Sequence, residues 1–141
     1  MTIGFVMLCH TAFDRVAQVA RHWVGQGCPV VIHVDTRASQ KDFDGLKDRL
    51  RDLADVRFSQ LFRCEWGTWS IVRATQASAE VMLADFPQVK YVYLASGSCL
   101  PMRPVADLVD YLATYPGKDF IESVTTEDVD WTVGGLDSER F

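Results

Sequence analysis

The chain has 141 residues, of which 48% are apolar and 23% are charged, and these proportions are typical of a single α/β domain. Nineteen acidic residues outnumber fourteen Lys and Arg, so the net charge is −5, which argues against a nucleic-acid or anionic-membrane binder that must neutralise phosphates. The apolar run at residues 3–9 is far shorter than the ~20 residues that span a bilayer. The sequence therefore predicts neither a membrane span nor nucleic acid as a partner.

Strand and helix patterns alternate along the first half of the chain. Residues 3–8 and 30–34 predict buried strands. Each is followed by a capping box, Thr11-x-x-Asp14 and Ser39-x-x-Asp42, and then by apolar residues at helical spacing. This order of elements is typical of a parallel sheet covered by helices.

The same alternation continues in the second half. The stripe of the helix predicted at residues 70–86 contains small residues, which indicates close packing against the sheet. Pro104 is expected at the first position of a later helix, where its missing N–H costs nothing. The other expected elements are a strand at 56–58, an aromatic loop at 63–68, a strand at 91–94 and a fifth strand that starts at Phe120 and Ile121. With no repeat or linker, residues 1–141 are expected to form one open, mostly parallel α/β unit.

Polar residues follow the predicted strands, at the edge where open parallel sheets bind ligands. His33 and Asp35 are two apart on an extended segment, so both are expected to address one ligand. A carboxylate that follows an apolar run must be solvated or bound to a ligand. The structural alternatives are that His10 caps a helix and that His33 is a core histidine bonded to the backbone. The segments concerned are Cys9-His10, 33–37 and Ser96-Gly97-Ser98-Cys99.

The loop at residues 64–70 contains Trp66 and Trp69 on either side of Gly67 and Thr68. An indole there can stack on a base or a sugar, and the alternative is that both tryptophans are buried under the loop. No G-x-G-x-x-G, Walker or G-x-S-x-G motif occurs. The four cysteines form no C-x-x-C pair and are expected to be small buried thiols.

Four short motifs occur in a fixed order: Cys9-His10 after a strand, Ile32-His33-Val34-Asp35, Trp66-Gly67-x-x-Ser70, and Leu94-x-Ser96-Gly97-x-x-x-Pro101. This series resembles the core-2/I-branching N-acetylglucosaminyltransferase and peptide O-xylosyltransferase family, and the last turn resembles its bacterial members. The resemblance implies a GT-A (Rossmann-like) fold and an inverting transfer of a sugar such as GlcNAc or xylose. The donor would be a UDP-sugar, and the acceptor a glycan or another hydroxyl. It also implies a role in bacterial polysaccharide synthesis, in the cytoplasm or peripherally at the inner membrane face.

The resemblance also implies roles for particular residues. The end of the first strand would line the uridine pocket with Met7, Leu8, Cys9 and His10. Asp35, Thr36 and Arg37 would hold uracil and ribose, with His33 and Trp66 in the same pocket. Glu122 would contact the acceptor sugar.

Most GT-A enzymes bind a cation through an Asp-x-Asp motif, whereas the corresponding turn here, 96–99, has no carboxylate. Asp128-x-Asp130 lies in a polar stretch and is expected on the solvated surface. The resemblance implies a family that needs no metal and whose Glu base lies beyond the matched region. The catalytic residue is thus unassigned, and the chain is expected to be the N-terminal portion of a longer enzyme. The alternatives are a non-catalytic nucleotide-binding module and a zinc or thiol hydrolase built on Cys9, His10, His33 and Cys99.

Overall fold

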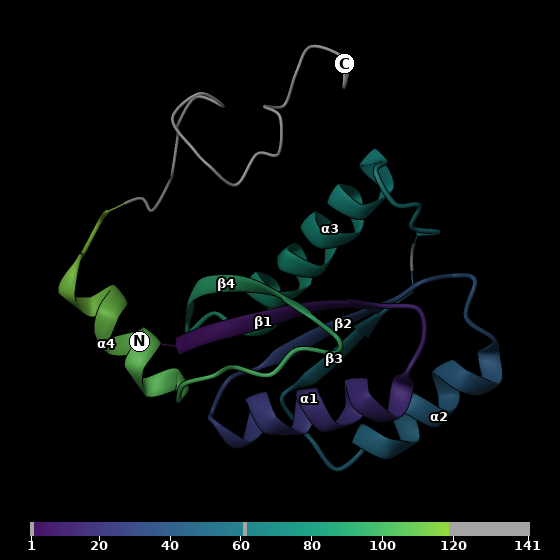
Figure 1. The fold of residues 1–141 in the computed structure, drawn as a ribbon, viewed down its shortest axis with the longest axis horizontal. Coiled ribbons are helices and arrows are strands. Elements are labelled where there is room, and N and C mark those ends of the chain that lie inside the picture. The colour runs from purple at the N-terminus through teal and green to yellow at the C-terminus, as the bar shows by residue number, and fades with distance from the viewer. Residues whose placement is uncertain (1, 61, 119–141) are drawn as a thin grey trace, which may run out of the picture.

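The computed structural model describes residues 2–60 and 62–118 and shows a parallel sheet with helices on both faces (Figure 1). The strands are β1 (Thr2–Cys9), β2 (Val30–Val34), β3 (Val56–Ser59) and β4 (Val89–Ser96), in the order β3-β2-β1-β4. The helices are α1 (Phe13–Gly25), α2 (Gln40–Leu50), α3 (Trp69–Asp85) and α4 (Val105–Thr114). The α/β class and the open parallel sheet are therefore confirmed. The strand expected at Phe120 and Ile121 lies outside the described residues.

β1 divides its side chains between the two faces of the sheet, because successive strand residues point in opposite directions. Ile3, Phe5 and Met7 are buried in the core that α1 and α2 cover, whereas Val6 is buried with Met82 of α3. Figure 1 shows α1 and α2 on one side of the strands and α3 on the other. Covered on both faces, β1 can be apolar at almost every position. None of the helices in the described part has the length and hydrophobicity that crossing a bilayer requires.

The two predicted capping boxes have different outcomes. Ser39 is the N-cap of α2, and its hydroxyl accepts a hydrogen bond from the amide of Asp42 at 3.1 Å, which confirms the predicted cap, while the Asp42 carboxylate accepts from the Ser39 hydroxyl rather than from its amide. The box at Thr11 is wrong, because the N-cap of α1 is Ala12 in the left-handed conformation (φ 53°), with no side-chain cap. The turn after β1 therefore starts α1 one residue later than the Thr11 box requires.

Smaller corrections concern other element ends. α3 starts at Trp69 rather than at Ser70, because Thr68 is its N-cap and accepts from the amide of Ser70. Pro104 is the N-cap of α4, not its first helical residue. β4 extends beyond the expected 91–94 at both ends, where it pairs with β1 from Thr2 to Leu8.

α3 packs very closely on β1, as its small residues indicated. Ala74 and Ser78 of α3 are fully buried against the sheet. Gly4 makes this approach possible, because a Cβ at that position would lie 2.5 Å from Sδ of Met82, which is itself fully buried. The absence of a side chain at Gly4 therefore leaves the space that Met82 fills between the helix and the sheet.

We predict that Gly4→Ala destabilises the fold by about 1–3 kcal/mol, because the added methyl overpacks a site that Met82 already fills. Urea unfolding followed by circular dichroism measures this free energy. Gly25→Ala is the matched control, since a Cβ there meets nothing within 4 Å. Equal stabilities of the Gly4→Ala variant and the native chain would show that α3 does not pack this closely.

Candidate functional site

A cavity of about 410 Å³ opens at the carboxyl ends of β1 and β2. The two strands are in register there, with Leu8 opposite His33 and Cys9 opposite Val34. Its wall comes from the ends of both strands, from the loop after β3 and from the first turns of α3: Leu8, Cys9, His10, His33, Asp35, Arg37, Cys64, Trp66 and Ile71. The structure thus brings together all the residues predicted for donor binding except Met7 and Thr36.

Met7 and Thr36 are placed elsewhere for simple geometric reasons. Met7 precedes Leu8 on β1, so its side chain points to the opposite face and is fully buried under α1 and α2. Thr36 is exposed, and its amide donates to the carbonyl of Phe62 at 3.2 Å. Neither residue lines the cavity. Glu122, predicted to contact an acceptor, lies outside the described residues, as do Asp128 and Asp130.

Asp35 is buried and densely hydrogen-bonded, in contrast to the expectation that it is solvated or bound to a ligand. Its side chain is 2% exposed. Oδ1 accepts from the amide and Nε of Arg37 at 2.8 and 2.9 Å, and Oδ2 accepts from Nη2 of Arg37 at 2.8 Å and from the amide of Cys64 at 2.9 Å. Donors within the protein, chiefly the bidentate guanidinium of Arg37, thus satisfy the carboxylate in place of the expected solvent or ligand.

This arrangement keeps Asp35 ionised. The hydrogen bonds from the Arg37 side chain lower the pKa of the Asp35 carboxyl far below its ordinary value, and they outweigh the opposing effect of burial. The same hydrogen bonds raise the pKa of Arg37. The cavity wall therefore contains a permanent ion pair whose guanidinium half is 46% exposed.

His33 is fully buried, yet it lines the cavity. Its Nε2 accepts a hydrogen bond from the amide of Phe62 at 3.2 Å, and its ring stacks on that of Phe62, with 6.0 Å between centroids. Burial lowers the pKa of His33, although the nearby Asp35 carboxylate acts in the opposite direction. The neutral imidazole is the form that can accept from an amide. The backbone-bonded alternative for His33 therefore matches the structure.

The loop after β3 presents Trp66 at the cavity. The indole of Trp66 is 95% exposed and that of Trp69 is 65% exposed, so the alternative that both are buried is wrong. Gly67 has φ +74°, which a residue with a side chain rarely adopts. The turn leaves Trp66 almost fully exposed at the cavity, where its indole is free to pack on a flat ligand.

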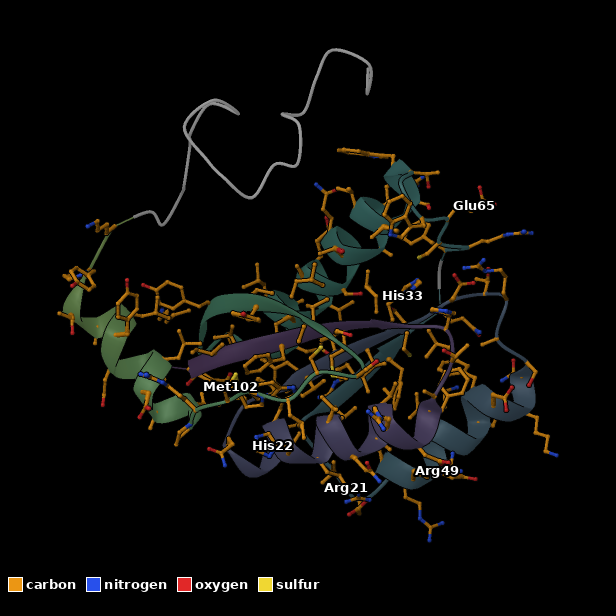
Figure 2. All side chains as sticks on the ribbon, viewed as in Figure 1. Arg21, His22, His33, Arg49, Glu65 and Met102 are labelled. Carbon is orange, nitrogen blue, oxygen red and sulfur yellow. The ribbon has the colours of Figure 1, made fainter. Side chains whose placement is uncertain are left out.

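Sequence reasoning missed the part played by main-chain groups at Phe62 and Cys64. The four groups involved, one N–H and one C=O on each residue, bond to His33, Thr36, Asp35 and Arg37. Figure 2 labels His33 near the carboxyl end of the sheet and Glu65 in the loop beyond it. No residue type at 62 or 64 signals such a role, because any amino acid except proline offers the same backbone groups.

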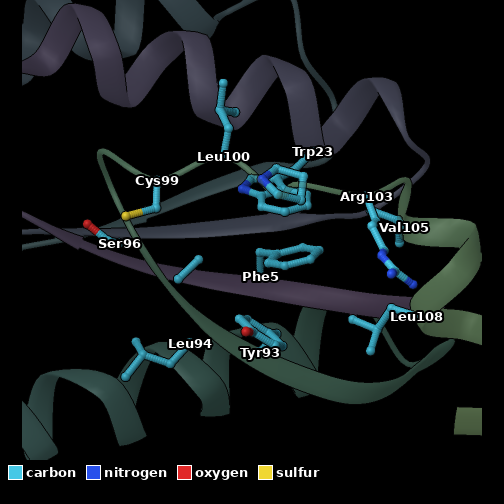
Figure 3. A pocket seen from close by; sticks show the side chains of 12 residues that line it. Phe5, Trp23, Tyr93, Leu94, Ser96, Cys99, Leu100, Arg103, Val105 and Leu108 are labelled. Carbon is cyan, nitrogen blue, oxygen red and sulfur yellow. The ribbon is translucent and has the colours of Figure 1, made fainter. Parts of the chain in front are cut away.

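A second cavity, of about 330 Å³, lies on the other face of the sheet and is mainly apolar. Figure 3 shows Phe5 between Trp23 and Tyr93, and the Phe5 and Trp23 rings stack with centroids 3.8 Å apart. Cys99 lines this cavity, whereas Cys9, His10 and His33 line the first one. The four residues of the hydrolase alternative are thus divided between the two cavities.

Two further observations bear on that alternative. Within residues 2–60 and 62–118, no three His, Cys, Asp or Glu side chains form a set that could hold a metal ion. Burial, aided by the Asp35 carboxylate, raises the pKa of Cys9 to about 12, so this thiol is protonated and a poor nucleophile at neutral pH. All four cysteines are free, but only Cys9 and Cys28 are buried as expected, since Cys64 is half-buried and Cys99 is exposed.

The fold and cavity define an α/β protein with a cavity at the carboxyl edge of a parallel sheet, the edge where open sheets of this kind bind ligands. The family model of the Core-2/I-Branching enzyme matches residues 5–139, and the chain belongs to this family of glycosyltransferases. The resemblance drawn from four short motifs is thereby confirmed at the level of the family. No curated protein matches the sequence.

We predict that Asp35→Asn destabilises the chain by about 1–3 kcal/mol near pH 7, because the donors of Arg37 and Cys64 lose a charged, buried acceptor. A lowered pKa means that the stabilisation is present above the ordinary Asp value of about 4 and is lost as the pH falls through the folded value. The difference in the free energy of unfolding between the native chain and the Asp35→Asn variant should therefore become smaller below about pH 4. Urea unfolding of both proteins at pH 7 and pH 3 measures this difference.

Asp52→Asn is the control for this experiment. Asp52 pairs with Arg21 in similar geometry, but both side chains are about half exposed, so its removal should matter much less. A gap for Asp35→Asn that is the same at both pH values would contradict the assigned ion pair.

Proposed function

We propose that the chain binds the donor of an inverting, metal-independent glycosyltransferase that uses a UDP-sugar, such as UDP-N-acetylglucosamine or UDP-xylose. The acceptor in this proposal is a glycan or another hydroxyl compound. Family membership supports sugar transfer. The observation that carries the donor assignment is the cavity, whose lining includes both an exposed indole and a half-exposed guanidinium.

Trp66 and Arg37 offer two complementary contacts for a nucleotide. A free indole face can stack on a pyrimidine, a contact worth about 1–3 kcal/mol in nucleic-acid complexes. Arg37 uses Nε and Nη2 on Asp35 and Cys64, while its Nη1 donates to no other residue in the described part. Nη1 can thus donate to a carbonyl or hydroxyl oxygen of uracil or ribose. Because Asp35 fixes the guanidinium, this donor is preorganised.

The turn after β4 supports the metal-independent part of the proposal. Ser96, Gly97, Ser98 and Cys99 supply hydroxyls and a thiol, whereas cations that neutralise a diphosphate prefer carboxylates. Gly97 is packed so tightly that a Cβ there would lie 3.0 Å from Cγ2 of Val16. We propose that cationic side chains stabilise the leaving diphosphate instead. No general base is assigned among the described residues. Glu122, which is proposed to contact the acceptor, lies outside them.

We predict that Trp66→Ala weakens binding of UDP about fivefold or more, as the loss of ~1 kcal/mol or more of stacking requires. Isothermal titration calorimetry with UDP measures this, with ADP as the competitor nucleotide. Trp69→Ala is the matched control, because Trp69 is also exposed but does not line the cavity. Equal affinities of both variants and the native chain would remove Trp66 from the site. The alternative of a non-catalytic nucleotide-binding module predicts the same UDP binding. An assay for turnover of the UDP-sugar distinguishes this alternative from a glycosyltransferase.

We also predict that EDTA leaves UDP-sugar binding and any turnover unchanged, because the 96–99 turn has no carboxylate for a cation. Calorimetry and a UDP-release assay, each with and without EDTA, measure this. Activity that disappears with EDTA and returns with manganese would contradict a metal-independent mechanism.

A further inference from the structure

We propose that His33 is a positioning residue of the donor site, which fixes the backbone of residues 62–64 and thereby places Trp66 at the cavity. This inference rests on the proposed function. It assigns His33 a role different from the direct contact with the ligand that the sequence predicted. Residues 62–64 together with the groups that bond them are called the clamp below.

The clamp continues the sheet after strand pairing has ended. β2 and β3 pair as far as His33 opposite Ser59. Beyond that point, the amide of Phe62 donates to Nε2 of His33, and its carbonyl accepts from the amide of Thr36. The amide of Cys64 donates to Oδ2 of Asp35, and its carbonyl accepts from Nη2 of Arg37. In three of these four hydrogen bonds, a side chain at or just after the end of β2 takes the place of the backbone group that a neighbouring strand would offer.

His33 is the innermost part of the clamp. It is fully buried, and the ring of Phe62 stacks on it at an interplanar angle of 21°. The guanidinium of Arg73, on α3, lies 4.9 Å from the centroid of the same Phe62 ring. Phe62 is thus held from both β2 and α3, and the hydrogen bond from its amide fixes the position of the backbone.

Trp66 depends on this support because it has little packing of its own. Its side chain is 95% exposed, so the surrounding backbone determines where the indole lies. On one side it is two residues from Cys64 in the clamp. On the other, the amide of Glu65 donates to Oγ of Ser70 and the hydroxyl of Thr68 donates to the carbonyl of Glu65, both at 2.9 Å. Loss of the His33 acceptor would remove the innermost of the four hydrogen bonds that hold the first of these two supports, and would thereby loosen it.

The test compares His33→Leu, which fills the space without an acceptor, with His33→Gln, whose carbonyl oxygen can accept from Phe62. We expect the Leu variant to bind UDP about fivefold to tenfold more weakly, which corresponds to one lost hydrogen bond. The Gln variant should recover most of the affinity. In the unliganded protein, the Phe62 amide should exchange with deuterium faster in the Leu variant than in the Gln variant. His22→Leu, an exposed site on α1, is the matched control.

Three outcomes would overturn the proposal. A Gln variant that binds UDP as weakly as the Leu variant would show a direct contact between imidazole and ligand. Native affinity in both variants, or unchanged exchange at Phe62, would show that the clamp does not depend on His33. If the Leu variant does not fold, as judged by circular dichroism, His33→Asn, whose shorter side chain ends before Phe62, replaces it. A native chain that binds no UDP would refute the proposed function, while the exchange rates would still test the clamp.

Discussion

The carboxylate of Asp35 stays ionised in a buried position because Arg37 donates to both of its oxygens and the amide of Cys64 donates to Oδ2. An unpaired charge at such a position would cost several kcal/mol. The need to satisfy this charge fixes the rotamer of Arg37 and ties the loop after β3 to the end of β2. The shape of the cavity at the carboxyl edge therefore follows from one electrostatic requirement. Membership in a glycosyltransferase family gives that cavity its functional context.

The side chains around this carboxylate are arranged by strand alternation. His33 and Asp35 are two residues apart and lie on the α3 side of the sheet, whereas Ile32 and Val34 belong to the core on the other side. Leu8 pairs opposite His33, so the same alternation brings β1 into the cavity wall. A shift of one residue in the register of β1 and β2 would reverse this distribution and bury the polar groups in the core.

Periodicity and turn chemistry predicted the elements well, because they act over short distances along the chain. The cap at Ser39 follows from a local hydrogen bond, and the same logic failed at Thr11, where the turn after β1 instead places Ala12 in the left-handed region. Alternation together with its position inside the strand could have excluded Met7, whereas Cys9, on the same face, reaches the cavity because it is the last residue of β1. The bonds of Phe62 and Cys64 could not be predicted, because they use backbone groups that carry no trace in the sequence. Family resemblance named most of the residues that line the cavity, but not which of them hold the others in place.

The contact between Gly4 and Met82 has an evolutionary consequence. With the helix in its present position, a Cβ at position 4 requires the side chain at position 82 to move aside or to be smaller. Homologues that keep a glycine at position 4 can keep a long, flexible side chain at position 82. The two positions, 78 residues apart in the sequence, are therefore expected to covary, and their joint variation would record the separation of helix and sheet in each lineage.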